Sequence, residues 1–151
     1  MRGGAKEVIE DAAWLKPTGR IIGVAMEIHN ELGPGHREYV HHDAMAAKLT
    51  FAGLEFEDEP HAFVTLEDGT VVGSNKPDLI VAETVIVELK ARPHSMTRDD
   101  QAQVIGYFAG WPQCPVALFI NFGRPRLEYR RLLPPRKVVA FQRSRWVKAP
   151  F

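Results

Sequence analysis

The sequence predicts an α/β fold in which one mixed β-sheet is flanked by helices, in the order α-α-β-β-β-β-α-β-β. Three observations predict it. Apolar residues first recur at helical spacing, the period changes to that of strands near residue 62, and one more helix interrupts the strands. Two strands are apolar at nearly every position, which is typical of strands covered on both faces.

Two helices are expected before the first strand. Apolar residues recur every three or four positions from residue 20 to residue 32, and Gly33-Pro34-Gly35 ends that helix. A second helix fits residues 36–52 for the same reason, and Gly53 is a natural stop after it. A third is expected over residues 97–109, with Thr97 as its N-cap.

Short apolar runs bounded by turn residues predict the strands, and Asp68-Gly69 predicts a hairpin between the first two. The expected strands cover residues 62–66, 70–72, 79–81, 85–89, 116–122 and 127–133. Residues 138–141 either add an edge strand or run loosely. The length indicates one domain over residues 19–135, with an irregular N-terminal arm (1–18) and a basic C-terminal tail (136–151).

Composition narrows the class of protein. The single cysteine, Cys114, excludes a disulfide within the chain and disfavours a cysteine-based zinc site. We expect a cytoplasmic protein without membrane contact, because no apolar run approaches about 18 residues and no signal peptide is evident. The net charge is zero, yet nine Lys or Arg and one acid follow residue 123. This basic segment either contacts nucleic-acid phosphates or pairs with acidic surface of its own chain or a partner.

Three charged residues lie on strands that should be buried: Asp78, Glu88 and Lys90. Glu88 and Lys90 are two apart, so they share a face of their strand. Asp78 lies opposite Glu88 on that face only if the turn is a three-residue loop at residues 82–84, since a two-residue loop would place it opposite Leu89. Hard oxygen ligands and a neighbouring lysine suit a magnesium site that cleaves phosphodiesters. The alternative is a cross-strand ion pair, which spacing alone favours; the expected burial favours the metal site.

Several motifs in order give the chain a family resemblance over residues 20–133. They are Gly35 and Glu38, with His41 where the family usually has tyrosine, then Pro77-Asp78, Glu88-Leu89-Lys90, Gln103 with Tyr107, and Asn121-Phe122-Gly123. With these residues the chain resembles the GxxExxY proteins, a branch of the PD-(D/E)XK nuclease superfamily. The resemblance implies a restriction-endonuclease-like fold and a divalent-metal nuclease site.

The resemblance also implies roles for particular residues. Asp78, Glu88, the carbonyl of Leu89 and Glu38 would hold Mg²⁺ or Mn²⁺, and Lys90 would be the catalytic lysine. Gln103 and Tyr107 would border the site. Arg92, His94 and Arg98 are candidate phosphate contacts, because they follow the strand of Lys90 at an end where phosphate could approach, although solvated loop charges are commoner. His41 or His42 lies on the same helix as Glu38 and could bind a metal or shuttle a proton. A surface or half-buried histidine with an ordinary partner is commoner.

Two functions of different classes follow. The first is a Mg²⁺- or Mn²⁺-dependent nuclease, acting on DNA in preference to RNA. The second is a binding or assembly module that keeps the nuclease fold without turnover and acts through a protein partner or a homodimer; the balanced net charge favours it. The three intact charges at residues 78, 88 and 90 favour the enzyme. A non-nuclease role with another substrate is a third possibility.

Overall fold

The computed structural model describes residues 13–135 and 146–148. Two helices come first, α2 (Leu15–Leu32) and α3 (Glu38–Phe51). The later elements are β1 (Phe56–Asp58), β2 (Ala62–Thr65), β3 (Val71–Asn75), β4 (Leu79–Val81), β5 (Val85–Lys90), α4 (Arg98–Tyr107), β6 (Val116–Asn121), β7 (Glu128–Leu132) and β8 (Trp146–Lys148).

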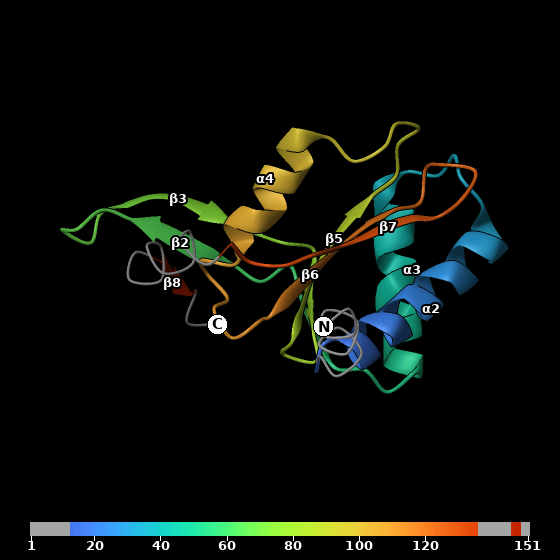
Figure 1. Ribbon diagram of the computed structural model, residues 1–151, viewed down its shortest axis with the longest axis horizontal. Coiled ribbons are helices and arrows are strands. Elements are labelled where there is room, and N and C mark those ends of the chain that lie inside the picture. Colours follow the sequence, from blue (N-terminus) through green and yellow to red (C-terminus); the bar gives the residue numbers. More distant parts are fainter. Residues whose placement is uncertain (1–12, 136–145, 149–151) are drawn as a thin grey trace, which may run out of the picture.

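A five-stranded mixed sheet with the order β1-β4-β5-β6-β7 forms the centre of the molecule. Strands β5 and β6 are parallel, joined by a crossover through α4, and every other pair is antiparallel. Helices α2 and α3 lie together on one face of this sheet and α4 lies on the other (Figure 1). The predicted fold class is therefore confirmed.

Alternation along the central strands creates the two layers of the core. Val87 and Leu89 of β5 pack in the cluster that includes α2 and α3, whereas Ile86 of the same strand packs in the cluster that includes α4. Strands β4 and β6 are buried at every position, as the apolar runs predicted. Each large apolar side chain buried in this way stabilises the fold by about 1.5–3 kcal/mol.

Helix α2 begins at Leu15, five residues before the predicted start at residue 20. Pro17 suggested irregular chain, but proline is tolerated in a first helical turn, where its missing N–H would have no intrahelical partner. Thr18 is buried there, and its hydroxyl donates to the carbonyl of Trp14 at 2.9 Å. No helix among the described residues is long and apolar enough to cross a membrane.

The expectation that all strands share one sheet is wrong. The β2–β3 hairpin pairs with β8 in a separate three-stranded sheet, and it projects away from the helices α2 and α3 (Figure 1). The turn signal predicted the hairpin pairing correctly but contains no information about where the hairpin docks. Strand β1 was not predicted; it pairs with β4 at the edge of the mixed sheet. The expected segment at residues 138–141 lies outside the described residues.

Candidate metal centre

The β4–β5 connection meets the geometric condition that the metal site requires. Val81 pairs with Val85 and Leu79 with Val87, so that three residues form the loop. Continuing this register by one step sets Asp78 opposite Glu88, on the face covered by α4. The loop is possible because Ala82 and Glu83 adopt positive φ angles of 52° and 55°, which non-glycine residues seldom do.

Glu88 is a carboxyl group almost removed from water. Only 4% of it is exposed, and its Oε2 accepts a hydrogen bond of 2.8 Å from the hydroxyl of Tyr107. The ammonium of Lys90 lies 4.0 Å from the same oxygen. Burial, together with the nearby Asp78, raises the pKa of Glu88 to about 8. At neutral pH this carboxyl therefore stays largely protonated unless a further positive charge arrives.

Asp78 is tied to the backbone of the neighbouring strand. Its Oδ2 accepts a 2.6 Å hydrogen bond from the N–H of Leu89. The carbonyl of Lys90 bonds to Phe122 on the β6 side, so the Leu89 carbonyl, one residue earlier in the strand, points to the opposite side, toward Asp78. The carbonyl thus faces the Asp78 side of β5, and its role as a metal ligand, which the family resemblance implies, stays a prediction.

Glu38 and Gln103 approach from two different helices. Glu38 opens α3, and the displacement of water around its carboxylate raises its pKa, an effect that Lys90 opposes and Asp78 strengthens. The structure therefore brings Glu38 to the same site as the strand residues. Gln103 lies one turn before Tyr107 on α4 but is exposed, and its side chain makes no hydrogen bond to another of the described residues.

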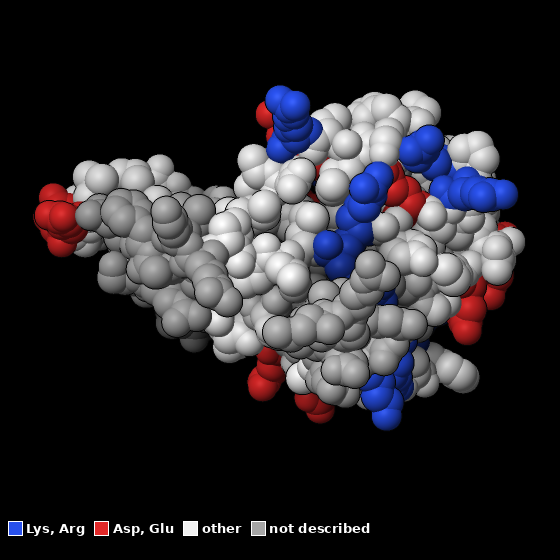
Figure 2. All heavy atoms as spheres, viewed as in Figure 1, with Lys and Arg blue, Asp and Glu red and all other residues white. Residues whose placement is uncertain are grey.

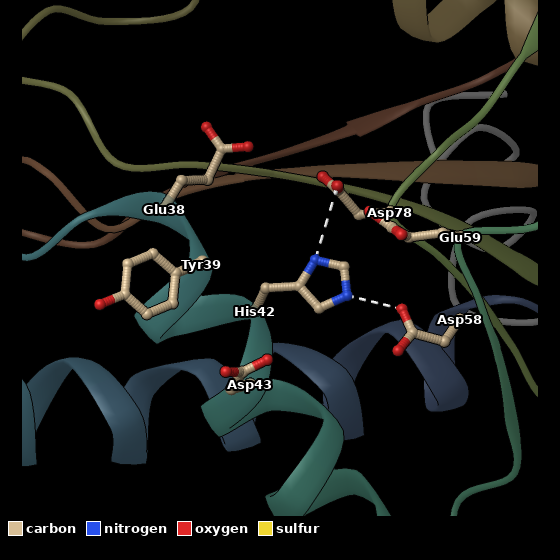
Figure 3. A pocket seen from close by; sticks show the side chains of 7 residues that line it. All are labelled: Glu38, Tyr39, His42, Asp43, Asp58, Glu59 and Asp78. Carbon is tan, nitrogen blue, oxygen red and sulfur yellow. Dashed lines mark hydrogen bonds and ion pairs between the residues drawn. The ribbon is translucent and has the colours of Figure 1, made fainter.

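A cavity of about 440 Å³ opens on the other side of Asp78 (Figure 3). It is rich in acids and is lined by Glu38, Tyr39, His42, Asp43, Asp58, Glu59 and Asp78. The ring of His42 lies between two carboxylates: Nε2 is 2.6 Å from Asp58 and Nδ1 is 3.6 Å from Asp78. Burial lowers the pKa of His42, but the hydrogen bond and charge of Asp58 outweigh it, and the net shift is upward.

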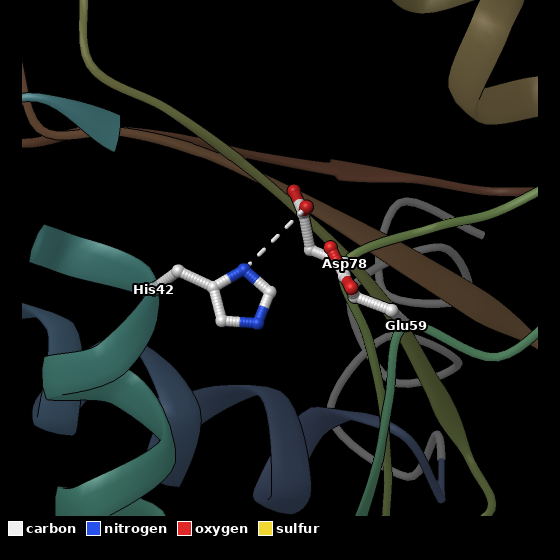
Figure 4. A group of neighbouring side chains, drawn as sticks. All are labelled: His42, Glu59 and Asp78. Atoms are coloured by element: carbon white, nitrogen blue, oxygen red, sulfur yellow. Dashed lines mark ion pairs between the residues drawn. The ribbon is translucent and has the colours of Figure 1, made fainter. Parts of the chain in front are cut away.

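His42, Glu59 and Asp78 form a group whose ligand atoms lie within 4.8 Å of one another (Figure 4). A histidine in the group suits Mn²⁺ or another transition metal better than Mg²⁺. Sequence analysis weighed His42 only as an alternative to His41 and missed Glu59. One signal was present, because Glu38 and His42 are four residues apart and so share a helix face.

His41 has a different role from its neighbour. It is fully buried, and its ring stacks on Phe122 with centroids 4.4 Å apart and planes 5° apart. Burial, and then the nearby His36 and His29, lower its pKa, so the imidazole is neutral. Within the described part of the chain neither ring nitrogen has a hydrogen-bond partner. At the position where the family usually has tyrosine, this chain places an aromatic ring in the core.

The three predicted phosphate contacts follow β5 in the chain, but their side chains differ in how free they are to bind a ligand. The guanidinium of Arg92 is bonded to Asp100 and lies 5.8 Å above the ring of Phe119, so this residue is held within the fold. His94 is exposed beside the carbonyl of Ser95, and Arg98 is exposed at the start of α4. The backbone here is fixed by close contact, since a Cβ on Gly123 would lie 2.1 Å from the Arg92 nitrogen.

Fold and site together define a restriction-endonuclease-like protein: a mixed sheet, helices on both faces, and an Asp, a Glu and a Lys at one sheet end. Comparison with protein-family models matches residues 16–132 to the PD-(D/E)XK nuclease superfamily, and the chain belongs to that superfamily. The match spans all five strands of the mixed sheet and the three described helices. No curated protein and no solved structure matches the chain.

Proposed function

We propose that the protein is a divalent-metal-dependent nuclease of the GxxExxY branch, hydrolysing phosphodiester bonds in DNA or, less favoured, in RNA. The observation that carries the proposal is the carboxyl pair of Asp78 and Glu88 with Lys90 beside it on one sheet face. The superfamily match supports a nuclease-type activity, since its members usually hydrolyse phosphodiesters with divalent metals.

The donor set fits Mg²⁺ or Mn²⁺. Asp78, Glu88, Glu38 and the Leu89 carbonyl offer hard oxygens, which these ions prefer. The raised pKa of Glu88 supports the fit, because a cation would favour the ionised carboxylate over the protonated form that burial imposes. When bound, the ion would polarise the scissile phosphate and lower the pKa of a coordinated water.

The remaining residues of the site orient the attacking water and the Glu88 carboxyl group, and they offset negative charge on the phosphate. The ammonium of Lys90 orients the attacking water and offsets the negative charge that builds on the phosphate in the transition state. Tyr107 donates a hydrogen bond from its hydroxyl to Oε2 of Glu88, which fixes the carboxyl group in one orientation. Gln103, exposed one turn earlier on α4, offers an amide at the rim of the site.

The test is cleavage of DNA and RNA, single- and double-stranded, with Mg²⁺, Mn²⁺ or EDTA. Wild type should cut only with a divalent metal, and Lys90→Ala should be slower by about 10²–10³-fold. Asp78→Ala should also abolish the heat of metal binding in a calorimetric titration. Lys16→Ala and Asp99→Asn remove the same charges from exposed positions on α2 and α4, and both should retain activity.

Two results would overturn the proposal. One is cleavage in EDTA, or full activity in both Asp78→Ala and Lys90→Ala. The other is folded protein that neither binds metal nor cuts any substrate, which would instead favour the binding or assembly module acting through a protein partner or a homodimer.

A further inference from the structure

Three arginines lie beside the metal centre, on the β6–β7 loop and on β7. Arg124, Arg126 and Arg130 line a cavity of about 490 Å³ together with Pro125, Leu127 and Glu128. In the space-filling view, Lys and Arg side chains gather over this loop and strand (Figure 2). All three belong to the basic segment after residue 123. Sequence analysis left two roles open for that segment: contact with nucleic-acid phosphates, or pairing with an acidic surface.

Sheet register connects these arginines to the metal centre. Glu88 pairs with Phe119, and Phe119 pairs with Arg130, so the three residues form one row across β5, β6 and β7. Residues in such a row point to the same face of the sheet. With strands about 4.8 Å apart, the Arg130 backbone lies about 10 Å from that of Glu88. That separation matches about three nucleotides, at about 3.4 Å of rise per nucleotide.

The guanidinium groups of this surface are available to a ligand. Glu128 is the one carboxylate among them, and it already accepts hydrogen bonds from Ser95 and from the backbone of Met96. Arg124 and Arg130 approach it only to 4.0 and 3.8 Å, and Arg126 is exposed, with no ion pair to any residue in the described ranges. Three cations thus face one occupied anion.

Neighbouring arginines do not share this availability. Arg92 is held by Asp100, as described above. Arg131, on the opposite face of β7, donates its Nε–H to the hydroxyl of Thr18 at 2.8 Å and lies over the ring of Trp14. Their guanidinium groups are used within the fold, whereas on the β6–β7 surface Arg124 and Arg130 make only long ion pairs with the shared Glu128.

We propose that Arg124, Arg126 and Arg130 bind backbone phosphates of a nucleic acid about three nucleotides from the scissile phosphate. This inference rests on the proposed nuclease function and names the surface that guides the substrate. Guanidinium groups pair with phosphate oxygens in a planar, two-point geometry. The acid-rich cavity also carries Asp43, Asp58 and Glu59, which the proposed metal site does not use. These acids would repel a polyanion, so a strand leaving the metal centre is directed across β7.

The experiment compares wild type, Arg126→Ala/Arg130→Ala and, as matched control, Arg20→Ala, an exposed arginine on α2 on the far face of the sheet. Fluorescence anisotropy with labelled DNA duplex, single-stranded DNA and RNA, in EDTA to prevent metal-dependent cleavage, gives affinity as a function of salt. Each lost phosphate contact lowers the salt slope by about 0.9 on duplex DNA. The double variant should therefore lose about two from the slope, and Arg20→Ala should lose none.

Hydrolysis of bis(p-nitrophenyl) phosphate separates this inference from the proposed function, since so small a diester reaches only the metal centre. The double variant should hydrolyse it at the wild-type rate. An unchanged salt slope, or no binding to any of the three nucleic acids, would overturn the inference even if the small diester is cleaved. Equally tight binding of polyglutamate would also overturn it, because the surface would then suit an acidic protein.

Discussion

Asp78 lies between two clusters that use the same residue types under opposite conditions of solvation. Toward α4, Glu88 is buried, and burial raises its pKa to about 8. Toward α3, His42 meets Asp58 and Glu59 in an open cavity, where the charge of Asp58 outweighs burial and raises the pKa of the histidine. The ammonium of Lys90 is therefore too weak an influence to ionise Glu88 at neutral pH, whereas the second cluster can gain a positive charge by protonation of His42.

The difference predicts which side of Asp78 the proposed catalytic ion would occupy. A divalent cation near Glu88 would compensate a carboxylate that the fold otherwise keeps protonated. A cation near His42 would first have to displace a proton from the imidazole and compete with the 2.6 Å contact to Asp58. We expect the ion on the Glu88 side, because a buried carboxylate there needs a neighbouring positive charge in order to ionise. The solvation of the acids indicates the position of the ion better than the number of acids in a cavity does.

The largest expected effect is the pH dependence of stability without metal. Because the folded pKa of Glu88 lies above the ordinary 4.5, the native state binds a proton that the unfolded state releases between pH 4.5 and about 8. Stability should therefore fall as pH rises through that interval, by about 5 kcal/mol in total. Glu88→Gln cannot titrate and should flatten this dependence.

Denaturant titrations in EDTA at pH 5 and pH 8 measure the effect, and Glu57→Gln, at an exposed position of β1, is the matched control. Addition of Mn²⁺ at pH 8 should stabilise wild type and Glu57→Gln but not Glu88→Gln. If stability depends on pH in the same way in wild type and in Glu88→Gln, the pH dependence comes from a group other than Glu88.

A smaller effect is expected from Tyr107→Phe. The variant loses the 2.8 Å hydrogen bond that orients Glu88 and favours its ionised form, while the ring still fills the core. Metal affinity should fall by about 10–100-fold. Calorimetry with Mn²⁺ measures it, and Tyr129→Phe removes a hydroxyl from a more exposed tyrosine on β7 as control. Equal affinity in both variants would show that Glu88 needs no orienting donor.

On the Glu88 side of this comparison, the sequence predicted the strand register and the burial, while the metal site itself stays a prediction. Asp78, Glu88 and Lys90 are held on one face by strand alternation and by the length of a single loop, and both are local properties of the chain. Burial of β4 and β5 also followed from their nearly continuous apolar runs. Local patterns were sufficient to predict this arrangement, because all three charged residues belong to one hairpin, β4–β5.

The His42 side depends on a tertiary contact that no local pattern shows. Asp58 and Glu59 reach the cavity because β1 pairs with the edge of the sheet, and β1 is a three-residue strand with two acids that has no strand-like apolar run. The ion pair of Arg92 is likewise invisible to local patterns, because its partner, Asp100, lies in the first turn of the next helix.

Replacement of His42 by alanine tests the less favoured cation position. With the ion on the Glu88 side, Mg²⁺-dependent cleavage at pH 8 should fall less than about tenfold, the lower end of what removal of an indirect partner causes. His36→Ala is the control, since His36 is an exposed histidine before α3. A loss as large as that of Lys90→Ala would move the catalytic ion to the group formed by His42, Glu59 and Asp78.

The smallest effect is expected from Asp58→Asn, which keeps the shape of the cavity and removes the charge nearest to His42. The pKa of His42 should fall, because burial then acts against less negative charge; Asp78 and Glu59 still oppose it. A raised histidine pKa stabilises the fold below the ordinary value of 6.5 and stops doing so as pH rises through the folded pKa. The variant should thus lose stability near pH 5, by less than about 1 kcal/mol because Asp58 is half exposed, and lose none at pH 9.

An NMR titration of the His42 ring measures this shift directly, and Asp43→Asn, at another acid that lines the cavity, is the control. Cleavage with Mg²⁺ at pH 8 should be unchanged in both variants, since at that pH neither substitution alters the charge around Glu88. If Asp58→Asn instead slows cleavage as much as Tyr107→Phe does, the two sides of Asp78 act as one site, and solvation does not separate them.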